Sequence, residues 1–142
     1  MLAMEKDPTL QDNVRTPASA TSRERTSLAH SFRCAGAGVL YVFRTQRNMK
    51  IHAFAAALAL LLGTLLRIDA PSWGLVILCI ALVIALECAN TALETVVDLV
   101  SPDYHDLAKH AKDCAAGGVL VAAAGSLAIG ALVFLPRIVE AL

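Results

Sequence analysis

The sequence has few aromatic residues and no excess of either charge. Phe, Tyr and Trp make up 5% of its 142 residues, and 12 Lys and Arg balance 12 Asp and Glu. Ala and Leu supply most of the apolar mass, which favours helices over a lipid-facing barrel of alternating residues. The balanced charge gives no reason to expect a nucleic-acid partner.

Signatures of several common functional classes are also missing. The four cysteines form no C-x-x-C pair and have no His at zinc-finger spacing, so we expect reduced cysteines packed within helices. There is no Walker A motif, and after CAGAG, residues 34–38, Tyr41 stands where a Gly-rich loop needs its third glycine. Any nucleotide site must therefore be built from helices. Residues 1–26 contain no apolar run behind a basic start, so a cleavable signal peptide is not expected.

What the sequence does contain is apolar. Hydrophobic residues make up 57% of the chain and the mean hydropathy is +0.63, too apolar for an ordinary soluble domain of this length. We predict an all-α, integral-membrane bundle of three transmembrane helices plus an N-terminal amphipathic surface helix. Residues 1–26, rich in Ser, Thr, Pro and charge, are predicted to be a disordered cytoplasmic tail.

The surface helix is predicted at about residues 27–47. Thr26 or Ser27 can cap it, and apolar residues recur every three or four positions from Leu28 to Val42. Its uncharged run is too short to cross a bilayer, so we expect it to lie in the membrane interface. Two roles are open for it: packing against the domain, or gathering a membrane substrate.

Spans are predicted at about 50–67, 73–100 and 112–136. The turn RIDAPS separates the first two, with Pro71 as breaker and Trp73 as an interface anchor. Ser-Pro-Asp at 101–103 fits a helix N-cap, so a further helix is expected to begin around Ser101.

Cations near the membrane are divided unequally between its two sides. One side would carry Arg33, Arg44, Arg47, Lys50, Lys109 and Lys112, and the other only Arg67 and Arg137. The positive-inside rule then predicts a cytoplasmic N-terminus and an external C-terminus. We expect a multi-pass protein of the cell (inner or plasma) membrane whose functional site lies at the cytoplasmic face.

Four polar residues interrupt the second predicted span. Glu87, Asn90, Glu94 and Asp98 are separated by 3, 4 and 4 positions, so they fall within about 80° of one another on a helix. Ionisable residues inside a membrane segment favour a functional interpretation. The structural alternatives are that Asp98 pairs with Lys109 or Arg44 and that Asn90 bonds a neighbouring helix.

A second polar cluster, DYHDLAKHAKD, covers residues 103–113. Taken alone, this cluster is best explained as a solvated charged face, and Asp106, His110 and Asp113 have no recognised zinc spacing. Glu87, Asn90, Glu94 and Asp98 form a polar stripe close to this cluster in the sequence. Together they indicate a second interpretation, in which carboxylates hold Mg²⁺ and a Lys contacts phosphate oxygens.

The sequence ECANTALETVVD, residues 87–98, resembles the E-x-x-N-[ST]-A-[ILV]-E-x-x-V-D signature of the prokaryotic diacylglycerol kinase family, which includes undecaprenol kinases. AKD at 111–113 is similar to the second motif of that family, and SFRCAGAGVLYVFRTQRNMKIH to its N-terminal helix. The resemblance covers about residues 27–135. It implies that residues 27–142 form a homotrimeric membrane lipid-kinase domain, which transfers the γ-phosphoryl of ATP to diacylglycerol or undecaprenol in phospholipid or envelope-lipid recycling.

The resemblance also implies roles for individual residues. Glu87 would be the general base, and Glu94 would coordinate the Mg²⁺ that bridges the ATP phosphates. Asn90 and Lys112 would contact phosphates. Asp113, with Asp103, Tyr104 and His105, would frame the nucleotide. The lipid would contact Asn48, His52 and Glu87.

One metal position departs from the family pattern. The family usually has a second metal-binding Glu where this chain has Gln46, and position 34, often aromatic, is Cys34. An amide oxygen can still ligate Mg²⁺ but brings no charge, so we expect an ATP site with weaker metal affinity. The alternatives are a compensating acid elsewhere and reduced activity. Two other classes of function also stay open: a non-catalytic assembly protein and an ion-conducting bundle.

Overall fold

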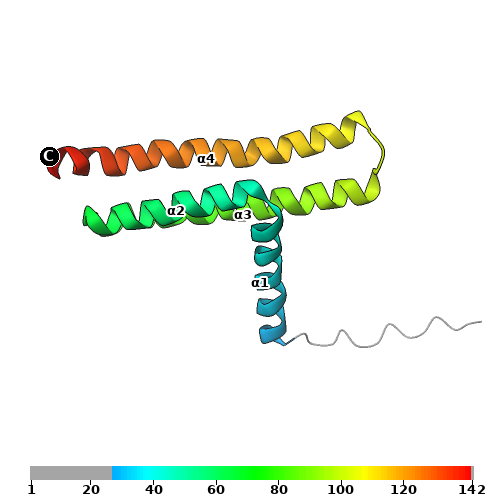
Figure 1. The fold of residues 1–142 in the computed structure, drawn as a ribbon, viewed down its shortest axis with the longest axis horizontal. Coiled ribbons are helices and arrows are strands. Elements are labelled where there is room, and N and C mark those ends of the chain that lie inside the picture. The colour runs from blue at the N-terminus through cyan, green and yellow to red at the C-terminus, as the bar shows by residue number, and fades with distance from the viewer. Residues whose placement is uncertain (1–26, 142) are drawn as a thin grey trace, which may run out of the picture.

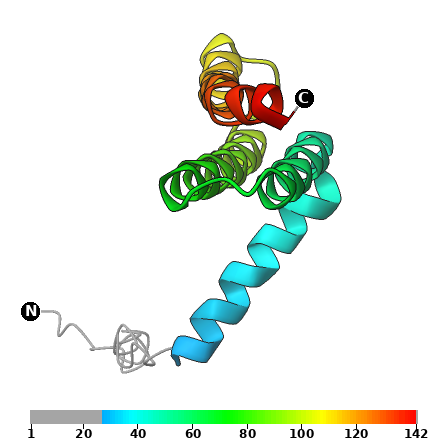
Figure 2. The ribbon, with the colours of Figure 1, turned by 90° about the vertical axis from the view of Figure 1, so that its left-hand side faces the viewer.

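The computed structural model describes residues 27–141, which form four helices. They are α1 (Leu28–Thr45), α2 (Arg47–Leu65), α3 (Ala70–Val100) and α4 (Asp106–Ala141). Figure 1 and Figure 2 show α2, α3 and α4 running side by side, while α1 runs across their direction. By length and apolar composition, α2, α3 and α4 could each cross a membrane. The predicted all-α class, three spans and separate N-terminal helix are therefore confirmed.

The break between α1 and α2 falls at Gln46. This residue is extended, with φ −95° and ψ 125°, so the chain turns there and α2 begins at Arg47. The end view in Figure 2 shows α1 projecting away from the other three helices. Val42 and Met49, one on each side of the break, are buried and anchor it against the bundle.

The α2–α3 turn is closed by a Schellman-type cap. The Ile68 N–H donates to the Gly63 carbonyl at 3.2 Å and the Arg67 N–H to the Thr64 carbonyl at 3.3 Å, with Arg67 at φ 49°. Trp73 packs over Gly63, where a Cβ would lie 2.8 Å from the indole ring. The absent side chain therefore lets α2 and α3 approach closely.

Helix α3 begins at Ala70, three residues before the predicted start. The Asp69 side chain accepts a hydrogen bond from the Ser72 N–H at 3.1 Å, and hydrogen bonding to the Ser72 side chain and backbone lowers the pKa of this carboxyl. Pro71 lies in the first turn, where its missing N–H is tolerated. It thus helps to start the helix and does not merely end the preceding one.

The predicted helix start at Ser101 is wrong. Ser101 is the C-terminal cap of α3, and α4 begins only at Asp106. Pro102 disfavours helical backbone at the residue before it, and α4 has to reverse direction to run antiparallel to α3. The helix also continues through Pro136 to Ala141 instead of ending there, as membrane helices can when neighbouring groups accommodate the lost hydrogen bond.

Candidate active site

The polar stripe of α3 lies where that helix meets α2 and α4. Glu87, Asn90 and Thr91 are buried, with 1%, 6% and 3% of their surface exposed. The Thr91 hydroxyl donates a hydrogen bond to the backbone carbonyl of Glu87 at 2.9 Å. This bond does not involve the Glu87 carboxylate. A carboxylate buried this completely is expensive unless it has a partner or a function.

Three helices line a half-open cavity of about 220 Å³ at this stripe. Helix α3 contributes Glu87, Asn90 and Glu94, and α2 contributes Asn48 and His52. The remaining wall is apolar and belongs mainly to α4: Ala116, Val119, Leu120 and Ala123. The structure therefore brings together all three predicted lipid contacts, Asn48, His52 and the predicted base Glu87, with the predicted metal ligand Glu94.

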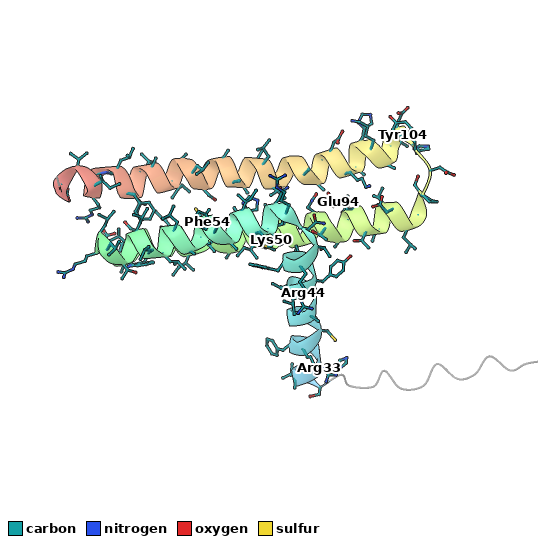
Figure 3. The ribbon with its side chains drawn as sticks, viewed as in Figure 1. Arg33, Arg44, Lys50, Phe54, Glu94 and Tyr104 are labelled. Carbon is teal, nitrogen blue, oxygen red and sulfur yellow. The ribbon has the colours of Figure 1, made fainter. Side chains whose placement is uncertain are left out.

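Gln46 reaches this site from the break between α1 and α2. Its Nε2 donates to Glu94 Oε2 at 3.5 Å, and Asn90 Nδ2 donates to Glu94 Oε1 at 3.1 Å. Figure 3 shows Glu94 close to the point where α1 joins the bundle. Residues 48 positions apart in the sequence are thus adjacent at the predicted metal position.

Two side-chain oxygens at the site are buried without a hydrogen-bond partner among residues 27–141. They are Glu87 Oε2 and Asn90 Oδ1. Since buried polar atoms are nearly always paired, unpaired oxygens that line a cavity point to a ligand that supplies a donor or a cation. Glu87 and Asn90 lie on one face of α3 and line the same cavity as Glu94, and Asn90 bonds the Glu94 carboxylate directly.

The donor set fits Mg²⁺ held jointly with phosphates. Mg²⁺ prefers oxygen ligands and is commonly bound by one or two carboxylates together with substrate phosphates and water. Glu94 offers the carboxylate, and the Gln46 and Asn90 side chains offer amide oxygens, because the amide orientation follows its hydrogen-bond partners. Within residues 27–141 no three His, Cys, Asp or Glu side chains form a metal cluster. The donor set therefore suits an ion that completes its coordination with phosphates and water.

Asp98 and Lys112 lie outside the cavity, further along the α3–α4 pair. Lys112 Nζ forms an ion pair with Asp98 Oδ1 at 2.5 Å, and both side chains are substantially exposed. The expected partners of Asp98, Lys109 and Arg44, are therefore not the ones observed. Lys109 pairs instead with Asp113 at 2.5 Å, one helical turn away.

The loop between α3 and α4 carries the other predicted nucleotide contacts. Asp103, Tyr104 and His105 are all exposed and none lines the cavity; Figure 3 shows Tyr104 at the far end of the α3–α4 pair. The Tyr104 hydroxyl donates to Asp106 Oδ1 at 2.9 Å, and this bond raises the pKa of the phenol. The His105 ring accepts the Leu107 N–H at 3.1 Å and so begins α4.

The small residues of α4 are a part of the site that sequence reasoning missed. Ala116, Val119 and Ala123 recur at 3 and 4 positions, which places them on one helix face toward the cavity. This spacing is visible in the sequence, but the whole segment is rich in Ala and Gly, so nothing singles out this face.

A second, apolar cavity of about 560 Å³ continues from the first. The two share Ile51, His52 and Ala123, and the larger one extends between α2, α3 and α4 toward Phe134. The polar side chains therefore lie at one end of a long apolar cavity, and His52 lines both cavities.

Comparison with known proteins agrees with this arrangement. Residues 33–134 match the prokaryotic diacylglycerol kinase family. The chain is 47% identical over 115 residues to a Synechocystis diacylglycerol kinase, a match that covers 80% of this chain and 66% of the relative. It is 44% identical over 108 residues to the undecaprenol kinase of Bacillus subtilis, a match that covers 76% of this chain and 88% of the relative. It is 38% identical over 68 residues to the Escherichia coli diacylglycerol kinase, a match that covers 48% of this chain and 56% of the relative.

The family match covers most of the chain and includes the buried stripe, Gln46 and the apolar face of α4. It favours an enzyme over the non-catalytic and ion-conducting alternatives, and a kinase implies the use of ATP. The chain belongs to the prokaryotic diacylglycerol kinase family and is a lipid kinase of the diacylglycerol kinase or undecaprenol kinase type.

Proposed function

We propose that this protein transfers the γ-phosphoryl group of ATP to the hydroxyl of a membrane lipid alcohol at the cytoplasmic face of the membrane. The observation that carries the proposal is the buried Glu87 carboxylate, whose Oε2 has no partner among the described residues and lines the polar cavity. An apolar cavity continues from this point, as an acceptor with one hydroxyl and long hydrocarbon chains requires.

In the proposed reaction, Glu87 Oε2 takes the proton of the lipid hydroxyl as its oxygen attacks the γ-phosphorus. The new oxygen–phosphorus bond replaces the bond to the β–γ bridging oxygen, and ADP leaves with that electron pair. His52 and Asn48, on the neighbouring face of α2, hold the hydroxyl end of the lipid. Positioning and charge neutralisation supply most of the remaining rate enhancement.

The proposed Mg²⁺ ligands are Glu94 and Gln46, the latter with its amide oxygen turned inward. The bound ion would neutralise charge on the ATP phosphates. Asn90 orients Glu94 through one Nδ2 hydrogen, and its second Nδ2 hydrogen would donate to a phosphate oxygen.

The nucleotide is proposed to extend from the cavity toward the α3–α4 loop. Lys112 would leave Asp98 to meet a phosphate, while Asp113, Asp103, Tyr104 and His105 would frame the rest of the nucleotide. Surface ion pairs contribute only about 0–1 kcal/mol, so the Lys112–Asp98 pair is easily exchanged for a phosphate.

The proposed orientation puts the N-terminus and the α3–α4 loop in the cytoplasm, where ATP is available. It is supported by the cations at that end of the bundle. We also propose a homotrimer, which the family resemblance implies. Long exposed apolar stretches on α2, α3 and α4 leave room for helix contacts between copies in the bilayer.

The test is an acceptor assay with purified protein in lipid nanodiscs. ATP and Mg²⁺ are supplied with diacylglycerol, undecaprenol or a long-chain alcohol lacking both structures, and transfer of γ-phosphate to lipid is measured. We expect transfer to diacylglycerol or undecaprenol and none to the third. Transfer to no lipid would contradict the proposed reaction.

Lys112→Met is expected to raise the ATP KM by about tenfold, because a hydrogen bond to a charged group contributes ~1.5–3 kcal/mol. Lys109→Met is the matched control, since Lys109 lies one helical turn away in an exposed pair with Asp113. Initial rates over a range of ATP concentrations measure both. Equal ATP KM values for the two variants would contradict the proposed contact between Lys112 and a phosphate.

A further inference from the structure

Helix α1 holds a cationic face for which the kinase reaction has no use. Around the helix, Arg33 and Arg44 lie within about 20° of each other, because eleven residues complete close to three turns. Both side chains are exposed, and neither takes part in an ion pair within the described residues. The only side-chain bond of Arg33 in that part of the chain is to the His30 ring, at 3.0 Å on the same face.

The opposite face of α1 is apolar and mostly uncovered. Leu28, Phe32 and Val39 are 78%, 77% and 45% exposed, whereas Val42, next to the bundle, is 5% exposed. Only the C-terminal end of α1 is therefore anchored by protein, and Figures 1 and 2 show the rest projecting freely.

An isolated helix of this composition needs a surface to stabilise it. Its 18 residues include Gly36 and Gly38, each about 1 kcal/mol less favourable than Ala in a helix, and no atom packs where their Cβ atoms would be. Because α1 runs across the direction of the three candidate spans, it lies along the surface of a membrane that they cross. Its apolar face can then enter the interface while the cationic face meets headgroups.

The charge pattern selects one class of headgroup. From residue 25 to residue 68 the sequence contains no Asp or Glu, so nothing on α1 or α2 offsets Arg33 and Arg44. Arg47 and Lys50 add to the positive potential in the first turn of α2, where the helix dipole already carries positive charge. We propose that the Arg33–Arg44 face of α1 docks on anionic phospholipid headgroups and thereby holds this helix on the bilayer surface.

Hydrogen–deuterium exchange of the full-length protein in nanodiscs tests this inference. Exchange of the α1 amides is compared between phosphatidylcholine alone and phosphatidylcholine with phosphatidylglycerol, without ATP or acceptor, so the outcome is independent of the kinase reaction. Two arginines near an anionic surface contribute about fivefold each, so we expect about twenty-fivefold slower exchange with phosphatidylglycerol. Raised salt should remove the difference.

The double variant Arg33→Gln, Arg44→Gln is expected to exchange equally in both lipids, with the single variants intermediate. Arg67→Gln, in the α2–α3 turn, is the matched control and should behave as the wild type. Equal exchange of wild-type α1 in the two lipids would overturn the inference, whether α1 is protected in both or in neither. A full response retained by the double variant, or lost in Arg67→Gln, would overturn it as well.

Discussion

Glu87→Gln is expected to reduce turnover about a thousandfold while leaving the fold intact. A general base contributes about 10²–10⁴ to rate, and an amide cannot take the hydroxyl proton. The replacement is nearly isosteric, and the Thr91 hydroxyl bonds the backbone carbonyl of residue 87 rather than its side chain. Single-turnover kinetics with saturating ATP and acceptor would isolate the chemical step from binding.

Two further variants make this result specific. Glu87→Asp keeps a carboxylate but withdraws it by one methylene, so we expect a rate between those of the wild type and Glu87→Gln. Glu140→Gln removes a carboxylate from the exposed Arg137–Glu140 pair and should leave turnover unchanged. Turnover of Glu87→Gln within about tenfold of wild type, with unchanged thermal stability, would exclude Glu87 as the base.

The α3 stripe could be predicted from the sequence because it depends on helical periodicity alone. Spacings of 3 and 4 fix which residues share a face, and Glu87, Asn90 and Glu94 indeed line one cavity. The residues that meet them from other helices could not be predicted from periodicity. Asn48, His52 and Gln46 were expected at the site only through the family resemblance, since their positions depend on how α2 crosses α3.

Loop geometry accounts for the errors. The sequence pattern at 101–103 fits a helix start as well as it fits a helix end, and only the reversal of α4 against α3 decides between them. The same reversal sets the register in which Lys112, and not Lys109, meets Asp98. The predicted surface helix likewise ran to residue 47, past the extended Gln46 that turns the chain into α2.

That break at Gln46 has a chemical consequence, because it is what presents this side chain to Glu94. Helix α1 ends at Thr45 and α2 starts at Arg47, so the only extended residue between them is also the proposed metal ligand. A helical residue at position 46 would point according to the helix period, whereas an extended one can reach across to α3. The position of α1 on the bundle and the metal site are therefore linked through one residue.

Gln46→Glu is expected to lower the Mg²⁺ concentration for half-maximal activity by about tenfold, which corresponds to ~1.4 kcal/mol. The added carboxylate would lie where Nε2 now contacts Glu94 Oε2 at 3.5 Å. Two like charges at that distance repel until a divalent cation enters between them. The thermal stability of this variant should consequently fall without Mg²⁺ and recover with it, more steeply than that of the wild type.

Thr45→Glu is the matched control, because it adds the same charge one residue earlier on an exposed side chain. We expect its Mg²⁺ dependence, in both activity and thermal stability, to follow the wild type. Direct Mn²⁺ binding, followed by electron paramagnetic resonance, should tighten for Gln46→Glu alone. If Gln46→Glu and wild type respond identically to Mg²⁺, position 46 does not touch the metal. Glu94 would then have to hold it with phosphates and water, and the extended residue at the α1–α2 break would serve only to turn the chain.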